Sequence, residues 1–219
     1  MSEQPRRVAV IGDVHACDRR LELLLVHLQE RDLDLVACVG DIVDGPGDPN
    51  AAAALLQAHD VAVVRGNHDR WILEGVLRDL PEAHAFDALT VTTVAYLSAL
   101  PASRELTLSN GTSLLLCHGL LENDMNKIAA DDYGYALEAN DEYQSLLRDG
   151  RSRVVVKGHR HRPAIWNAGP LTLVDAGSLL EECETCAVIV DGGSSTITPL
   201  RIGPHGVYSG APEWRFKTG

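Results

Sequence analysis

Short apolar runs alternate with longer amphipathic segments along the first third of the chain. Runs of four or five apolar residues at 8–11, 35–39 and 61–64 are typical of strands that are buried on both faces. Leucines recur at helical spacing over 19–29 and alanines fill 51–58, so helices are expected at both places. This strand–helix–strand–helix–strand order with short links predicts parallel pairing with right-handed crossovers.

Polar residues predict where the helices of this part begin. Asp18 and Asn50 are the expected N-caps of the first two helices, because their side chains can accept a hydrogen bond from a first-turn N–H group. Further helices are expected over 69–80 and 87–99. The β-branched run 90–94 leaves a strand as the alternative to the last of these helices.

Hairpins replace the strand–helix alternation in the second half of the chain. Strands at 105–108 and 113–117 flank an Asn-Gly turn, and a helix is expected over 135–148. Further strands are expected at 153–157, 164–167, 171–174, 187–190 and 196–201. Strand–helix units followed by hairpins predict an α/β fold in which two sheets pack together.

The chain shows no internal repeat and no linker. One domain is therefore expected over residues 1–219, a length that suffices for one well-buried core. Residues 203–219 are expected to form a C-terminal tail, which either docks across a face through Trp214 or frays.

Charge and cysteine content limit the kinds of partner. The formal net charge of −12 argues against a nucleic-acid groove and a membrane surface, since both require basic patches. No apolar run approaches the roughly 20 residues of a membrane span, and the N-terminus enters a strand without a signal-peptide pattern. The five cysteines are an odd number, and Cys183-x-x-Cys186 has no second pair that would complete a zinc site. A cytoplasmic location is therefore expected, and the oligomeric state is left open.

Chemically active side chains follow the predicted strands where each strand ends. They are Asp13 and His15, Asp41 and Asp44, Asn67, His68 and Asp69, His118, and His159 and His161. Five of the nine histidines lie at these strand ends, whereas His27, His59, His84 and His205 are expected to be structural or solvated. The ends of neighbouring strands meet at one edge of a sheet, so the charge concentrated there indicates a bound cation.

The types and spacing of these residues favour a metal centre. In Asp13-x-His15 and His159-x-His161, alternate residues of an extended backbone point to the same side and can reach one centre. Asp, Asn and His ligands without cysteine suit Mn, Fe, Zn or Co. The ligands are too many for one tetrahedral ion, but two ions about 3.5–4 Å apart and bridged by a carboxylate would use them all.

Five ordered blocks carry a resemblance to a known family. They are Gly12-Asp13-Val14-His15, Gly40-Asp41-Ile42-Val43-Asp44, Gly66-Asn67-His68-Asp69, His118-Gly119 and Gly158-His159-Arg160-His161. These blocks resemble the signature blocks of the calcineurin-like metallophosphoesterases. The small size and the trailing Ala176-Gly177-Ser178 are similar to the compact bacterial and archaeal phosphodiesterase branch. The resemblance implies a four-layer α/β/β/α sandwich of two mixed β-sheets flanked by helices.

The resemblance also implies the metal ligands. One metal would be held by Asp13, His15 and His161, the other by Asn67, His118 and His159, with Asp41 as the bridge. Mn²⁺ is the expected ion, with Fe, Zn, Co or Ni as alternatives. A metal-bridging hydroxide would attack phosphorus in line, while the cations and the Asn67 amide stabilise the phosphoryl oxygens.

His68 is implied to be the general acid that protonates the leaving alkoxide. In the protein-phosphatase branch of the family this histidine pairs with the second Asp of the Gly-Asp-x-Val-Asp block, so Asp44 is the expected partner. Asp69 is the next residue along the chain, and its role is left open between a partner of His68 and a loop or helix cap.

One departure from the family pattern bears on the class of substrate. The protein phosphatases that resemble this chain carry a phosphate-gripping arginine where Gly45-Pro46 stands here, which favours small phosphoesters or nucleotides over protein substrates. Arg65 and Arg160 are candidate phosphate contacts, with salt bridging or solvation as the alternative. The 120–150 segment either lines the substrate mouth, through Asn123, Asp124, Asn126 and Tyr133, or is a solvated acidic surface.

These observations together predict a dinuclear-metal phosphoesterase, with diester hydrolysis favoured over monoester hydrolysis. A phosphomonoesterase or an activity like that of protein Ser/Thr phosphatases is the first alternative. The second is a non-catalytic metal-binding scaffold on the same fold. The presence of all seven predicted ligands together with His68 argues against the scaffold.

Overall fold

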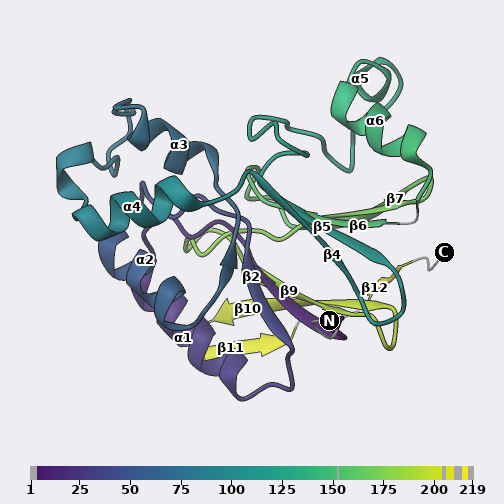
Figure 1. The fold of residues 1–219 in the computed structure, drawn as a ribbon, viewed down its shortest axis with the longest axis horizontal. Coiled ribbons are helices and arrows are strands. Elements are labelled where there is room, and N and C mark those ends of the chain that lie inside the picture. The colour runs from purple at the N-terminus through teal and green to yellow at the C-terminus, as the bar shows by residue number, and fades with distance from the viewer. Residues whose placement is uncertain (1–3, 152, 204–205, 210–213, 217–219) are drawn as a thin grey trace.

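The fold consists of two β-sheets that pack face to face (Figure 1). The computed structural model describes residues 4–151, 153–203, 206–209 and 214–216. The strands of the larger sheet are β1 (Arg7–Ile11), β2 (Leu35–Cys38), β3 (Ala62–Val63), β9 (Thr185–Asp191), β10 (Thr196–Gly203), β11 (Gly206–Ser209) and β12 (Trp214–Arg215). Their order is β11-β10-β9-β1-β2-β3, with β12 paired to β10. β1, β2 and β3 pair in parallel, as the early strand–helix units predict, and β9 runs antiparallel to β1.

The smaller sheet is built from the hairpin region of the chain. Its strands are β4 (Ser103–Thr107), β5 (Ser113–Cys117), β6 (Arg153–Lys157), β7 (Ala164–Ala168) and β8 (Leu171–Asp175). The strand order is β4-β5-β6-β8-β7. The central strands β5, β6 and β8 are parallel, and the two edge strands are antiparallel to their neighbours. Both sheets are therefore mixed.

Helices cover the two outer faces of the sheet pair. The helices are α1 (Asp18–Gln29), α2 (Pro49–Ala58), α3 (Asn67–Leu73), the 3-10 helix η1 (Phe86–Ala88), α4 (Val91–Ala99), α5 (Tyr135–Glu138) and α6 (Asp141–Asp149). In Figure 1, α1, α2, α3 and α4 lie on one side of the molecule, whereas α5 and α6 lie over the smaller sheet on the other side. The predicted four-layer α/β/β/α sandwich is confirmed.

Successive side chains of the central strands point to opposite faces of the sheet, which explains why there are two layers of hydrophobic core. In β1, Val8 and Val10 pack between the sheets, whereas Ala9 and Ile11 pack against the helices. Successive side chains of a strand point to opposite faces, so a strand in the middle of four layers needs an unbroken apolar run. A third apolar cluster joins the outer face of the smaller sheet to α6.

The predicted caps of the first two helices are wrong. Asp18 is the first residue of α1 rather than its cap, and its Oδ1 accepts a hydrogen bond from the N–H of Asp48 (3.2 Å). Asp48 caps α2, accepting from Asn50 N (2.8 Å) and Ala51 N (3.3 Å). Asn50 instead accepts from Thr90 N (2.8 Å). An Asp before a proline takes the cap because Pro49 fits the first helical position, where no N–H is needed.

Two predicted helices are shorter than expected. The helix predicted over 69–80 is α3, which begins at Asn67 and ends at Leu73, and Gly75 follows in the left-handed region (φ 74°). The helix predicted over 135–148 is divided into α5 and α6. Asn140 makes this division, because its side chain accepts from Tyr143 N (3.0 Å) and starts a new helix. The helix predicted over 87–99 begins only at Val91, as α4, with Thr90 as its cap, and it rules out the strand alternative.

Part of the predicted tail pairs with the larger sheet. Trp214 lies opposite Ile197 in the pairing of β12 with β10, and Phe216 is buried between the sheets. Residues 204–205, 210–213 and 217–219 of the predicted tail lie outside the described residues. Within the described ranges, the helices are all too short or too polar to cross a membrane.

Candidate metal centre

The seven predicted metal ligands lie at one place, where strand ends of both sheets meet. Asp13 and His15 follow β1, Asp41 follows β2, Asn67 starts α3, His118 follows β5, and His159 and His161 follow β6. Five of them, Asp13, His15, Asp41, Asn67 and His118, are buried. The larger sheet and its helices supply four of the seven residues, and the smaller sheet supplies the three others.

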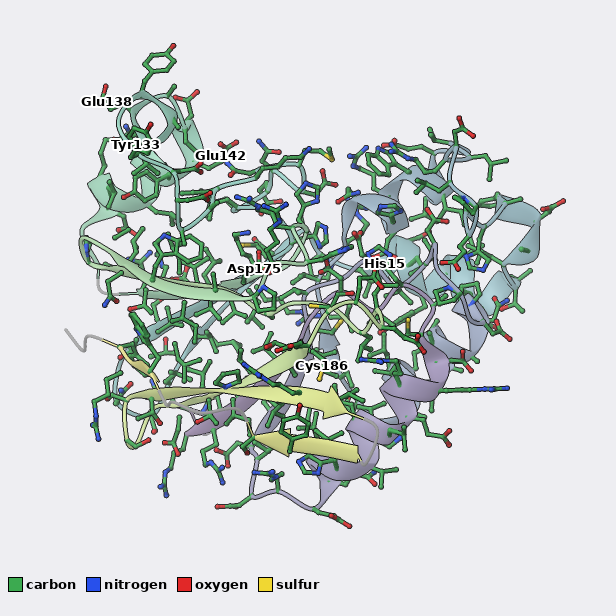
Figure 2. All side chains as sticks on the ribbon, turned by 180° about the vertical axis from the view of Figure 1, so that it is seen from behind. His15, Tyr133, Glu138, Glu142, Asp175 and Cys186 are labelled. Carbon is green, nitrogen blue, oxygen red and sulfur yellow. The ribbon has the colours of Figure 1, made fainter. Side chains whose placement is uncertain are left out.

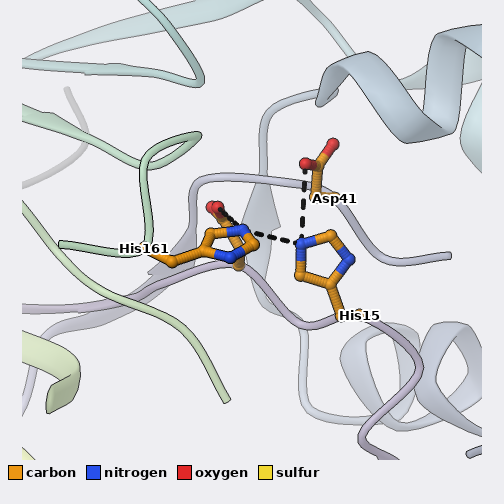
Figure 3. A group of neighbouring side chains, drawn as sticks. His15, Asp41 and His161 are labelled. Carbon is orange, nitrogen blue, oxygen red and sulfur yellow. Dashed lines mark hydrogen bonds and ion pairs between the residues drawn. The ribbon is translucent and has the colours of Figure 1, made fainter. Parts of the chain in front are cut away.

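A first group of donor atoms comes from Asp13, His15, Asp41 and His161. One ligand atom from each lies within 4.8 Å of all the others. Figure 3 shows the side chains of His15, Asp41 and His161 turned toward one another. The Nε2 atoms of His15 and His161 are 2.8 Å apart, and His161 Nε2 is 3.0 Å from Asp13 Oδ2. The group contains the residues that the resemblance implies for the first metal.

A second group adjoins the first. Oδ1 of Asn67 lies 2.8 Å from His118 Nε2 and 2.7 Å from His159 Nδ1. Oδ2 of Asp41 lies 3.2 Å from His118 Nε2 and 3.8 Å from His15 Nε2. The same carboxylate oxygen therefore faces both groups.

Hydrogen bonds to main-chain carbonyls fix two of the histidines in a form that suits metal binding. Nδ1 of His15 lies 2.7 Å from the carbonyl oxygen of Asp44, and Nδ1 of His118 lies 2.8 Å from that of Val39. A carbonyl oxygen only accepts, so each Nδ1 carries a proton and each Nε2 is the atom that a metal would use once it is deprotonated. Oδ1 of Asp13 and Nε2 of His159 are buried without a hydrogen-bond partner among the described residues. These donors fit a divalent metal of the Mn, Fe, Zn or Co type.

The charges around His118 give a second indication of a cation site. Burial opposes protonation of His118, but Asp41 and Asp13 outweigh burial and raise its pKa to about 10. Burial also favours neutral Asp41, yet His118 and His15 lower the pKa of this carboxyl well below its usual range. The carboxylates thus hold positive charge at this point. Binding of a divalent cation would release the His118 proton, because a metal ligand must be deprotonated.

Asp44, and not Asp69, lies against His68. Nδ1 of His68 is 2.7 Å from Asp44 Oδ2. Burial lowers the pKa of His68, but the hydrogen bond to Asp44 and the charge of Asp41 outweigh burial and raise the pKa above its usual value. The imidazole ring of His68 is 5.1 Å from that of His15, so the pair borders the first donor group.

Asp69 joins two of the site loops through main-chain hydrogen bonds. Its Oδ1 accepts from Ile42 N (2.7 Å) and Val43 N (3.3 Å), and its Oδ2 accepts from Gly66 N (3.0 Å). The side chain is fully buried. Asp69 therefore fixes the loop that carries Asp41 and Asp44 against the start of α3.

Replacement of Asp69 with alanine is expected to lower the free energy of unfolding by about 3 kcal/mol, because three N–H groups lose their buried acceptor. Urea denaturation measures this loss. Asp79→Ala is the matched control, since Asp79 is exposed, and it should change stability by less than about 0.5 kcal/mol. Equal stabilities of the two variants would remove Asp69 from this structural role.

The backbone of the site is unusual. His15, Asp41, Asp44, His159 and His161 all have left-handed backbone, with φ of 47°, 47°, 61°, 74° and 53°. Residues other than glycine rarely adopt this region, and such strain concentrates at functional sites. Five residues of the predicted site are thus among the nine positive-φ non-glycine residues that the described ranges contain.

A buried ion pair behind the site escaped sequence reasoning. Nζ of Lys157 lies 3.2 Å from Asp175 Oδ2 and donates to the carbonyl of Gly158 (3.2 Å). Burial raises the pKa of Asp175 to about 6, although Lys157 opposes this. Both residues end apolar runs, and this position is the only signal of the pair in the sequence. Figure 2 labels Asp175 in the interior of the molecule.

The contacts of the two predicted substrate arginines do not assign them to a phosphate site. The main-chain N–H of Arg65 donates to Pro101 O (2.7 Å), and Arg160 Nη1 donates to Lys127 O (3.1 Å). Neither lines the cavity beside His15 and His68. Their role in substrate binding stays a prediction.

The predicted mouth residues of the 120–150 segment make contacts of their own. Asp124 forms a two-fold ion pair with Arg70 (2.7 and 3.0 Å), and Asn126 donates to Asn140 and Glu142. Tyr133 is 83% exposed. Figure 2 shows Tyr133, Glu138 and Glu142 well away from His15. Asn126 is buried whereas Tyr133 is exposed, so both alternatives for the segment stay predictions.

Comparison with known proteins identifies the family. The model of the calcineurin-like phosphoesterase superfamily domain matches residues 7–191, which include every residue of the two donor groups. The chain belongs to this superfamily. Both donor groups of this calcineurin-like protein therefore lie within the matched domain.

Individual relatives are distant from this calcineurin-like protein. Serine/threonine-protein phosphatase 1 of Salmonella typhimurium is 36% identical over 73 residues, a match that covers 32% of this chain and 32% of that relative. The structure of PH1004 of Pyrococcus horikoshii matches with a TM-score of 0.69 and 16% identity, and the match covers 89% of this chain and 87% of that chain. The structure of the phosphoesterase Yfce of E. coli matches with a TM-score of 0.61 and 15% identity, and the match covers 96% of this chain and 100% of that chain. The chain thus matches only about a third of the phosphatase, and the two structures show likeness of fold alone.

Proposed function

We propose that the protein is a phosphodiesterase that uses two divalent cations, Mn²⁺ being the expected ion, to hydrolyse small phosphoesters or nucleotides. The observation that carries the proposal is Asp41 Oδ2, which faces both donor groups at 3.2 and 3.8 Å. In this proposal Asp13, His15 and His161 hold one cation, Asn67, His118 and His159 hold the other, and Asp41 bridges them.

The chemistry divides between the cations and the chain. When bound, two divalent cations activate water and neutralise charge on the phosphoryl oxygens. His68 supplies the proton that the leaving oxygen needs. Its Nδ1 donates to Asp44, so Nε2 is the atom that is free to protonate the leaving group. The raised pKa of His68 favours the protonated form that this role requires.

Turnover of bis-p-nitrophenyl phosphate and of p-nitrophenyl phosphate with added Mn²⁺ tests the proposal. Faster hydrolysis of the diester supports a phosphodiesterase, and faster hydrolysis of the monoester supports the phosphomonoesterase alternative. A phosphoserine peptide in the same panel tests the protein-phosphatase alternative, which the match to serine/threonine-protein phosphatase 1 favours and Gly45-Pro46 disfavours. Absence of turnover with metal bound would leave the scaffold. A cytoplasmic location belongs to the same proposal, and the five unpaired cysteines support it.

His84 is a positioning residue that the sequence did not assign. The N–H of Asp44 donates to His84 Nδ1 (3.1 Å), and the N–H of His84 donates to Asp44 Oδ1 (2.8 Å). A third bond, from Gly45 N to the carbonyl of Glu82 (2.9 Å), joins the same two loops. These contacts hold Asp44 in its left-handed conformation and its Oδ2 toward His68.

Replacement of His84 with alanine is expected to lower kcat by roughly tenfold for esters with poor leaving groups, and less for p-nitrophenyl esters, because only poor leaving groups depend strongly on the general acid. The measurement is kcat against the pKa of the leaving alcohol. His84→Asn should recover part of the loss, since its amide oxygen can accept from Asp44 N. His59→Ala is the control, because His59 contacts Gln29 instead. An equal loss with every leaving group would make His84 merely structural.

A further inference from the structure

One cavity opens beside the predicted acid. Its volume is about 1120 Å³, and its wall includes His15, His68 and His161. His118, His159 and Asn67 are not part of the wall. The cavity therefore extends from the side of the site on which His68 lies. If His68 protonates the leaving group, as proposed above, the leaving group occupies this cavity.

Arg20 lies in the wall of the same cavity. Leu24 follows Arg20 by four residues on the same face of α1, and Cys17 is the N-cap residue of this helix. Burial raises the pKa of the Cys17 and Cys186 thiols to about 11 and about 12, and the main opposing effect on each is the charge of Arg20. The guanidinium charge thus acts on both thiols.

The guanidinium of Arg20 is only partly satisfied. Its Nε and Nη2 are shielded from solvent and have no hydrogen-bond partner among the described residues. A shielded cationic donor without a partner is costly, so such groups are normally paired. The nearby carboxylates Glu82 and Glu182 are exposed, and within the described ranges no ion pair joins either of them to Arg20. Arg20 is thus a cationic side chain of the cavity wall that no carboxylate of the described residues pairs with.

We propose that Arg20 binds an anionic group, a carboxylate or a phosphoryl group, on the leaving-group side of the substrate. The planar fork of donors fits the two oxygens of either group. The proposal rests on the function proposed above for the direction of the leaving group, and it narrows the substrate class to phosphoesters whose leaving group is itself charged. The exposed Glu82, Glu181 and Glu182 at the cavity add negative charge, which favours a single anionic group over a polyphosphate.

Calorimetric titration of the Mn²⁺-loaded protein with ω-phosphonoalkanoates tests the proposal. The phosphonate group of the ligand is expected to bind at the metal site, and the ligand is lengthened from phosphonoacetate one methylene at a time. Each acid is compared with the alkylphosphonate of equal length. At one length the acid is expected to bind about tenfold more tightly than its control, the usual effect of a charge-assisted hydrogen bond. A second series of α,ω-bisphosphonates separates phosphoryl from carboxylate recognition.

In Arg20→Gln the affinity ratio of acid to control is expected to fall to about one. Arg31→Gln is the matched control, because Arg31 lies beyond the other end of α1 beside His27, and this variant should keep the ratio. Arg20→Lys keeps the positive charge but loses the planar guanidinium donors, so it should lower the affinity ratio in part. This variant also provides the test if Arg20→Gln fails to fold.

Three outcomes would overturn the proposal. The first is an affinity ratio of acid to control of about one at every length in the unaltered protein, and the second is a preference for the acid that survives in both Arg20 variants. The third is a non-additive loss of stability in Arg20→Gln and Glu182→Gln, which would identify Glu182 as the partner of Arg20. The titration needs no turnover. If the acid binds more tightly than its alkylphosphonate control through Arg20 but no phosphoester is hydrolysed, the proposed function is wrong. If phosphoesters are hydrolysed but the acid has no such advantage, only the Arg20 site is wrong.

Discussion

Replacement of Asp41 with asparagine is expected to lower turnover by roughly a thousandfold or more and to reduce the metal content of the purified protein. The reason is the position of Oδ2 between His118 and His15, where a neutral amide neither balances two cations nor bridges them. Asparagine keeps an oxygen for the N–H of His68, which Asp41 Oδ1 accepts at 2.9 Å, so the loop geometry should persist. Elemental analysis and bis-p-nitrophenyl phosphate hydrolysis measure the two effects.

Chelation separates loss of metal from loss of fold. Removal of metal from the unaltered protein should abolish turnover, and added Mn²⁺ should restore it, whereas Asp41→Asn should not recover. Asp34→Asn is the matched control, because Asp34 accepts from the main chain of Arg6 and Arg7 at the far end of β1. Full metal occupancy and ordinary turnover in Asp41→Asn would contradict the dinuclear centre.

His68→Asn is expected to lower kcat by about 10²–10⁴ for esters with poor leaving groups while metal occupancy stays unchanged. The leaving oxygen then has no proton donor, but no ligand is lost. A pH profile gives a second measurement. His68 acts while protonated, so kcat should fall as pH rises through its raised pKa, and this descending limb should be missing in the variant.

Two further variants sharpen the test of His68. Asp44→Asn should reproduce a large part of the loss, because Oδ2 of Asp44 holds the His68 proton at Nδ1. His27→Asn is the control, since His27 contacts Arg31 on α1. Loss of metal from His68→Asn would instead make His68 a ligand.

Much of this fold could be predicted because its strands are buried on both faces. Val8–Ile11 faces two different cores, so its apolar run has no polar interruption and its end is marked by glycine and charge. The candidate site follows from the same fact, since the active side chains come directly after these runs. The pairing of His68 with Asp44 was predicted through the resemblance and agrees with the 2.7 Å distance.

The parts that could not be predicted depend on contacts between distant segments. Asn50 is as good a cap as Asp48 by composition, but it accepts from Thr90, which lies 40 residues further along the chain. The role of Asp69 was open in the sequence, because its three main-chain donors lie in other loop segments or at the start of α3. Arg20 and His84 carry no motif at all, and only the cavity and the loop contacts assign them roles.

The left-handed backbone of His15, Asp41, Asp44, His159 and His161 has a consequence for laboratory evolution. Glycine adopts this conformation at little cost, so at these positions it relieves strain while deleting the side chain that function needs. A library sorted only for folded protein should therefore enrich glycine or asparagine there, whereas a library sorted for turnover should retain histidine and aspartate. The positions at which the two selections diverge most would outline the catalytic centre without any knowledge of its substrate.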